Sequence, residues 1–231
     1  MFAFDASLSW TVGALWYAGV LFGALAVSWL ATDLGRIRRT PYIGILAVAT
    51  GLLSWGFGSH VGAGFEFWSR RWPVGLGGGV AAGVLLFVLA RRIPASPHAH
   101  GKELGRLAMW ECIAYGTAEG VLLSVLPVAT VWQAAGASGW SEGVAGSSLT
   151  AVAALVASAV VVVVHHLGYW EFRGPLMRFP VVWCTILAMA YLATGSPLAP
   201  IVAHILLHAA MVLRGMELPP HPRAAVATAG G

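Results

Sequence analysis

Two histidines with helical spacing are the side chains best suited to carry chemistry in this sequence. His204 and His208 lie four residues apart in segment 196–213, where Ser196 is the only other polar side chain. A spacing of four residues places two side chains on one face of a helix, about one turn apart. Because an unsatisfied polar group in lipid costs several kcal/mol, we expect these imidazoles to have partners.

The candidate partners lie in two other apolar segments. Glu119 lies within the apolar segment 107–128, and His165 and His166 follow the five valines 160–164. Neighbouring residues on a helix point about 100° apart, so only one histidine of this pair can face a given helix. The sequence therefore predicts one carboxylate and three imidazoles drawn from three segments.

The composition is that of a membrane protein. Hydrophobic residues make up 58% of the 231 residues and charged residues only 10%, which is far from the usual composition of a soluble domain. The N-terminus lacks the pattern of a cleavable signal peptide, and two cysteines in apolar segments do not indicate a disulfide framework. The net charge of +4 is explained by basic loops between spans, so no nucleic-acid partner is expected.

Apolar segments of about 18 or more residues predict membrane-spanning helices. The sequence predicts an all-α polytopic bundle of about seven spans, and an eighth span is possible. The seven are residues 8–31, 43–65, 74–89, 107–133, 149–168, 179–193 and 198–213.

The distribution of basic residues predicts how the chain is oriented. With the N-terminus outside, only Arg70 and Arg71 among the 13 Lys and Arg residues lie outside. Because Lys and Arg favour cytoplasmic loops, the prediction is N-out and C-in. The chain divides into a three-span N-terminal region (residues 1–92), a cytoplasmic loop (93–106), a four-span C-terminal region (107–216) and a disordered tail (217–231).

Glu119 is the acidic residue with the strongest functional signal, because a carboxylate in the middle of a span is costly. Glu111 and Tyr115 precede it on roughly the same side of the helix, although we expect Glu111 to be an interfacial residue near Arg106. His60 and Glu66 lie near the predicted outer end of the second span and are expected to be interfacial.

One carboxylate with three imidazoles is compatible with two kinds of chemistry. It is a suitable ligand set for zinc or iron, and equally a set of general base and oxyanion donors for attack of water on an amide. The HExxH motif of zinc proteases is absent, because Ile205 follows His204.

The order of these residues resembles the CPBP family of membrane-embedded CAAX prenyl proteases and bacteriocin-processing enzymes. The family pattern is EExxxR on one span, FxxxH on a later span and HxxxN on the last. Segments 119–124 (EGVLLS), 158–167 (SAVVVVVHHL) and 191–213 resemble these motifs, and the likeness covers about 107–214. The sequence departs from the pattern at four positions. Gly120 replaces the second glutamate and Ser124 the arginine, while Val162 replaces the phenylalanine and His208 the asparagine.

The resemblance implies a role for each matched residue. It selects His166 over His165, and implies that Glu119 and His166 polarise water while His204 and His208 stabilise the oxyanion. The same four residues, Glu119, His166, His204 and His208, are the implied ligands of zinc or another divalent transition metal such as iron. Histidine at position 208 keeps a hydrogen-bond donor and adds a metal ligand.

Three functions follow as expectations. The first is an intramembrane peptidase of the plasma membrane that cuts a membrane-associated protein or peptide. The second is a catalytically silent binding or assembly subunit of the membrane. The third is a metalloenzyme that uses a 3-His/1-Glu site.

Overall fold

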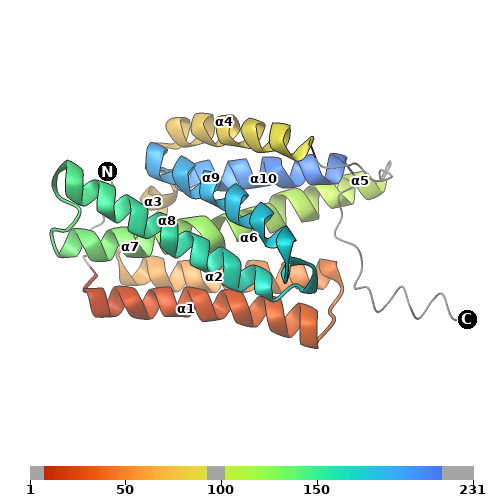
Figure 1. Ribbon diagram of the computed structural model, residues 1–231, viewed down its shortest axis with the longest axis horizontal. Coiled ribbons are helices and arrows are strands. Elements are labelled where there is room, and N and C mark those ends of the chain that lie inside the picture. Colours follow the sequence, from red (N-terminus) through yellow and green to blue (C-terminus); the bar gives the residue numbers. More distant parts are fainter. Residues whose placement is uncertain (1–7, 93–101, 215–231) are drawn as a thin grey trace, which may run out of the picture.

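The computed structural model describes residues 8–92 and 102–214, and every regular element in these ranges is helical (Figure 1). The predicted all-α fold is confirmed. The elements are α1 (Trp10–Ser28), η1 (Trp29–Leu34), α2 (Arg39–His60), α3 (Phe65–Ser69), α4 (Trp72–Ala90), α5 (Lys102–Leu107), η2 (Ala108–Tyr115), α6 (Gly116–Glu119), η3 (Gly120–Val125), α7 (Leu126–Ala137), α8 (Gly143–Leu167), η4 (Trp170–Phe172), η5 (Pro175–Met177), α9 (Arg178–Thr194) and α10 (Leu198–Leu213).

Two predicted segments fall largely outside the described residues. The tail 217–231, predicted to be disordered, lies outside them, as do residues 93–101 of the predicted loop 93–106. The rest of that loop is helical, because α5 already begins at Lys102.

Six helical segments are long and apolar enough to cross a membrane. They are Trp10–Leu34, Arg39–His60, Trp72–Ala90, Gly105–Ala137, Gly143–Leu167 and Pro175–Thr194. The seventh predicted span corresponds to α10, which has 16 residues and a length of about 24 Å. This chain is therefore a membrane protein, and α10 is shorter than the roughly 20 residues of an ordinary spanning helix.

The span Gly105–Ala137, here called the central helix, forms the middle of the bundle. In its most apolar 18-residue stretch 83% of the residues are buried, against 22–33% in the other five spans. It runs from α5 through η2, α6 and η3 to α7 without a break. Glu119, which lies on this helix, is therefore surrounded by protein.

The central helix departs from ideal α geometry on both sides of Glu119. The stretches η2 and η3 are π-helical, and α6 between them ends at Glu119. Pro127 follows η3 in the first turn of α7. Proline lacks an N–H and cannot continue an ordinary ladder of helical hydrogen bonds, and π turns accommodate such interruptions and are frequent at functional sites.

The other helices surround the central helix on opposite sides. In Figure 1, α1 and α2 lie along the lower side and α4 along the upper side, with α10 between α4 and the central helix. The helices α8 and α9 contact each other and the central helix. The predicted N-terminal and C-terminal regions thus pack together, because α4 rests on α10 and α1 on α7 and α8.

Glycines on α4 allow α10 to approach closely. A Cβ atom on Gly79 would lie 2.8 Å from the carbonyl oxygen of Ala199, and one on Gly83 would lie 2.5 Å from Leu206 Cδ1. Small residues at such contacts let membrane helices pack backbone to backbone. This contact supports the face of α10 opposite its histidines.

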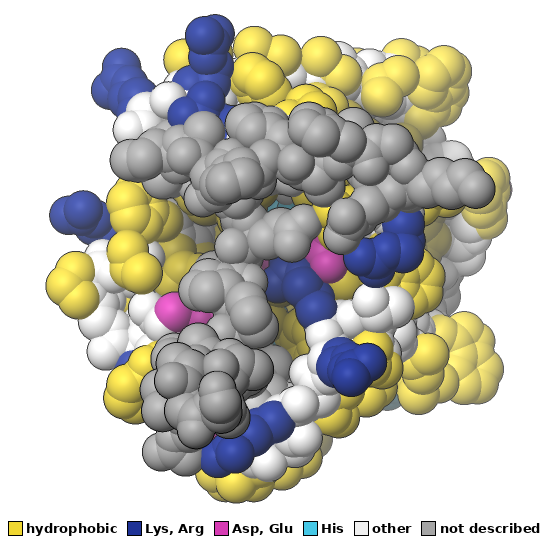
Figure 2. Space-filling view, turned by 90° about the vertical axis from the view of Figure 1, so that its right-hand side faces the viewer, with side chains coloured by type: hydrophobic (Ala, Val, Ile, Leu, Met, Phe, Trp, Pro, Cys, Tyr) yellow, Lys and Arg dark blue, Asp and Glu magenta, His cyan; other side chains and the backbone are white. Residues whose placement is uncertain are grey.

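The arginine-bearing helix ends gather at one end of the bundle. The segments 29–39, 90–92, 102–107, 168–178 and 213–214 meet at the right-hand end of Figure 1. Figure 2 views this end and shows several dark-blue Lys and Arg side chains around its rim. Arg70 and Arg71 lie between α3 and α4, at the opposite end. The predicted N-out, C-in orientation stays a prediction.

Replacing Gly79 by Ala is expected to lower the free energy of unfolding by about 1–3 kcal/mol, because the new methyl group overpacks the contact between α4 and α10. The matched control is Gly77→Ala on the same helix, where a Cβ would meet no atom within 4 Å. Denaturant titration in detergent micelles measures both changes. Equal stability of the two variants would contradict the close packing described here.

Candidate active site

Glu119 is the centre of a polar cluster inside the bundle. Its side chain is buried at the end of α6 and meets three imidazoles. Oε1 lies 3.2 Å from His165 Nε2, while Oε2 lies 3.3 Å from His204 Nε2 and 3.1 Å from His208 Nε2. One carboxylate thus joins the central helix to α8 through one oxygen and to α10 through the other.

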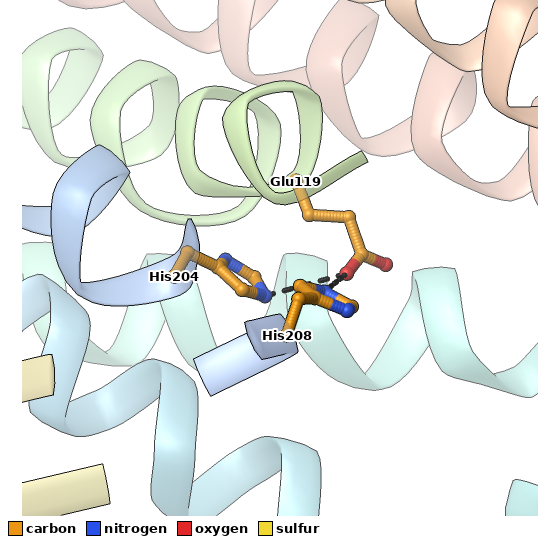
Figure 3. Close-up of side chains that lie close together, drawn as sticks. All are labelled: Glu119, His204 and His208. Atoms are coloured by element: carbon orange, nitrogen blue, oxygen red, sulfur yellow. Dashed lines mark hydrogen bonds and ion pairs between the residues drawn. The ribbon is translucent and has the colours of Figure 1, made fainter. Parts of the chain in front are cut away.

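His204 and His208 share one face of α10, as their spacing predicts. Their rings are stacked, with centroids 5.0 Å apart and planes inclined by 14°. Figure 3 shows both imidazoles pointing from successive turns of α10 to the same oxygen of Glu119. The structure thus brings Glu119, His204 and His208 together.

Glycines on the central helix allow the short distances between Glu119 and the two histidines of α10. A Cβ atom on Gly116 would lie 3.0 Å from the Cα of Ile205, and one on Gly120 would lie 3.1 Å from the Cα of Ile201. The Gly120 Cβ would also lie 3.5 Å from the Cβ of His204. Since a larger residue would push α10 away, Gly116 and Gly120 set the distance between Glu119 and the two histidines.

The structure differs from the sequence prediction in the histidine that α8 supplies. His165, and not His166, contacts Glu119. The Nδ1 of His166 lies 2.8 Å from the carbonyl oxygen of Val162, and its ring packs against Phe172. The physical reason is the rotation of about 100° between neighbouring helical residues, which turns His166 away when His165 faces the central helix.

The hydrogen bonds of His165 determine where its proton lies. Its Nδ1 is 3.1 Å from the carbonyl oxygen of Ala24 on α1, and a carbonyl only accepts, so Nδ1 donates. In the neutral ring Nε2 then carries a lone pair directed at Glu119 Oε1. Because two acceptors repel each other, the contact between Nε2 and Oε1 becomes attractive once Nε2 carries a proton.

The negative charge of Glu119 requires compensation within the bundle. Arg39 reaches the interior from the start of α2, but it forms an ion pair with Glu111, so its charge is already matched. Glu111, which was expected at the membrane interface near Arg106, is buried and pairs with Arg39, while Arg106 contacts the neighbouring Thr40. A buried carboxylate without a counter-charge is strongly disfavoured, which leaves the imidazoles or a bound cation to balance Glu119.

Three buried phenols extend the cluster from His165 toward Arg39. The hydroxyl of Tyr169 lies 3.2 Å from His165 Nε2 and 3.1 Å from the hydroxyl of Tyr115, and it also contacts the hydroxyl of Tyr42. Arg39 lies over the ring of Tyr115, 4.9 Å from its centroid. Burial raises the pKa of Tyr169 well above its ordinary value, so this phenol keeps its proton.

The residues on the Oε2 side of Glu119 fit a divalent metal. One ligand atom each of Glu119, His204 and His208 lies within 4.8 Å of the others. Tetrahedral zinc with bonds of 2.0–2.1 Å holds its ligand atoms about 3.3 Å apart, and the two Glu–His separations are 3.1 and 3.3 Å. Two histidines and one glutamate are also the ligand set of zinc sites that keep a position open for water.

Sequence reasoning missed the outer residues of the site. Arg39 and Tyr42 are three residues apart at the start of α2, a spacing that indicates a shared face but no partner. Tyr169 lies two residues after the end of α8, beside the exposed Trp170, and no pattern in the sequence distinguishes it as buried. His60 is exposed at the end of α2, away from Glu119.

Comparisons with protein-family models, with curated proteins and with solved structures found no match.

Proposed function

We propose that this protein is an intramembrane peptidase of the CPBP type, with Glu119, His165, His204 and His208 as its reactive groups. The observation that supports this most is the convergence of three imidazoles on the two oxygens of one buried carboxylate. Charged and polar groups inside membrane helices are costly and are generally retained for function. The resemblance of segments 119–124, 158–167 and 191–213 to the family motifs supports the same proposal.

The position of the site favours a membrane-associated protein or peptide as the substrate. Glu119 lies on the central helix, enclosed by helices that expose apolar side chains at their outer faces. A peptide that already lies in or on the bilayer reaches such a site more readily than a soluble protein does. The plasma membrane is the proposed location, and no nucleic acid takes part.

His165 is the proposed proton acceptor. Its Nε2 lone pair, fixed by the bond from Nδ1 to Ala24, can take a proton from water as the water oxygen attacks an amide carbonyl carbon. The proton then passes to the amide nitrogen as the carbon–nitrogen bond breaks, which yields a carboxylic acid and an amine. Once Nε2 is protonated, it donates to Glu119 Oε1, and the carboxylate stabilises the positively charged ring.

His204 and His208 have two alternative contributions at Oε2. With Glu119 they are the proposed ligands of zinc or another divalent transition metal, which when bound would make water more acidic and polarise the carbonyl. Without metal, their Nε2–H groups are the donors that stabilise the oxyanion. Metal analysis distinguishes these two versions of the same peptidase.

Two of the four departures from the family motif, Gly120 and Ser124, lie on the central helix. Gly120 stands for the second glutamate, and it is the residue that lets α10 approach Glu119. Ser124, in place of the arginine, is fully buried. A carboxylate and a guanidinium are still present beside the site, because Glu111 and Arg39 are joined there.

In the metal-bound version of the proposal, purified protein contains about one zinc or iron ion per chain, and His208→Ala or Glu119→Gln loses it. Loss of one of three protein ligands removes most of the affinity of such a site. The measurement is elemental analysis of detergent-purified protein, with His60→Ala as the control because His60 is exposed and does not belong to the group of Glu119, His204 and His208. Equal metal content in all variants would contradict the assigned ligands.

His165→Gln is expected to lower the cleavage rate by about 10²–10⁴-fold, the usual contribution of a general base. His166→Gln serves as the matched control, since His166 is adjacent in sequence but bonds Val162 rather than Glu119. Cleavage of lipid-anchored fluorogenic peptides by the protein in liposomes measures both. A greater loss in His166→Gln would restore His166 as the active residue. The binding or assembly subunit is favoured instead if the folded wild-type protein cleaves no peptide and Glu119→Ala leaves its fold and its function unchanged.

A further inference from the structure

Tyr169 is the hub of the three-phenol cluster. Tyr42 comes from α2, Tyr115 from η2 and Tyr169 from the residues after α8, and all three side chains are buried. Of the three hydroxyls, that of Tyr169 contacts both of the others and also His165 Nε2. It is therefore the hydroxyl that connects the phenols to the Glu119 cluster.

The donors and acceptors of the cluster balance in one simple way. A phenol has one proton to donate and can accept two hydrogen bonds. Tyr169 can donate to the lone pair of His165 Nε2 and accept from Tyr42 and Tyr115, which uses every phenolic proton. If Nε2 carries a proton instead, the Tyr169 oxygen can accept from Nε2–H and from one phenol, and Tyr169 can donate to the other phenol. A hydroxyl at this position bonds the ring in either state.

His165 is consequently held at both ring nitrogens. The Ala24 carbonyl accepts from Nδ1 at 3.1 Å, and Tyr169 lies 3.2 Å from Nε2. These contacts come from two distant stretches of the chain and fix the rotation of the ring about its χ2 angle. The direction of Nε2 toward Glu119 Oε1 follows from that rotation.

The backbone next to Tyr169 is held against the bundle by a hydrogen bond and a nearby ion pair. Thr32 Oγ1 donates to the carbonyl oxygen of Gly168 at 2.8 Å, and Arg173 forms an ion pair with Asp33 at 2.9 Å. A Cβ atom on Gly168 would lie 2.2 Å from Ser28 Oγ, so this backbone rests directly on the α1–η1 helix. A side chain on an anchored backbone is suited to fixing a neighbour within a fraction of an ångström.

We propose that Tyr169 is a positioning residue that acts through His165, holding its imidazole in line with the Glu119 carboxylate. The effect on rate depends on the proposed function, whereas the effect on the His165 ring depends on the geometry alone. Removing the hydroxyl leaves Tyr42 and Tyr115 without their common acceptor and frees Nε2 on one side.

The experiment is the substitution Tyr169→Phe, compared with Tyr17→Phe. Tyr17 is the matched control because its hydroxyl donates to the Ala157 carbonyl at 3.0 Å instead of joining the three-phenol cluster. Both variants are assayed for peptide cleavage in the wild-type and in the His165→Gln background. The expected result is a fall in kcat of about 10–100-fold for Tyr169→Phe, with KM unchanged, no fall for Tyr17→Phe, and no further fall when Tyr169→Phe is added to His165→Gln.

A second readout does not need activity. In protein labelled with ¹⁵N-histidine, the imidazole signals absent from His165→Gln identify His165, and its Nε2 signal is expected to move in Tyr169→Phe but not in Tyr17→Phe. An unmoved Nε2 signal, or equal losses of activity from Tyr169→Phe in both backgrounds, would overturn the role of Tyr169. Wild-type protein without peptidase activity would refute the proposed function alone, and the imidazole signal would still support or overturn this inference.

Discussion

The charge of Glu119 is the constraint on which the rest of the structure depends. A carboxylate enclosed by apolar helices loses its hydration, and this loss must be offset by hydrogen bonds or by positive charge nearby. Three imidazoles provide such contacts, one at Oε1 and two at Oε2. The helices that carry them must therefore stay in place, and the packing of α8 and α10 against the central helix keeps them there.

Backbone proximity, more than side-chain bulk, sets the geometry around this charge. Gly116 and Gly120 bring the central helix against one side of α10, while Gly79 and Gly83 bring α4 against another. Lipid tails are as apolar as leucine, so close packing rather than the hydrophobic effect holds membrane helices together. α10 is thus fixed between two glycine-bearing surfaces, and a shift of either one would move both histidines relative to Glu119.

The sequence predicted where the helices lie along the chain, but it predicted only part of how they are rotated and packed against one another. Apolar segment length identified the helices, and a spacing of four residues was enough to place His204 and His208 together, since both properties are local. The choice between His165 and His166 depends on how α8 is rotated about its axis, which its neighbours decide. The pair of Arg39 and Glu111 joins residues 72 positions apart, and no local pattern records such a contact.

The unequal lengths of the helices have a consequence for the surrounding lipid. The α1–η1 and α8 segments have 25 residues each, whereas α4 has 19 and α10 has 16. At 1.5 Å per residue the two long segments are about 37 Å long, and α4 and α10 are about 24–28 Å long. The hydrocarbon layer of a bilayer is about 30 Å thick. Such hydrophobic mismatch is relieved by tilting of the long helices and local thinning of the bilayer. Thinning of the bilayer beside the short helix α4 would bring bulk water closer to α10, which packs behind α4 and carries His204 and His208.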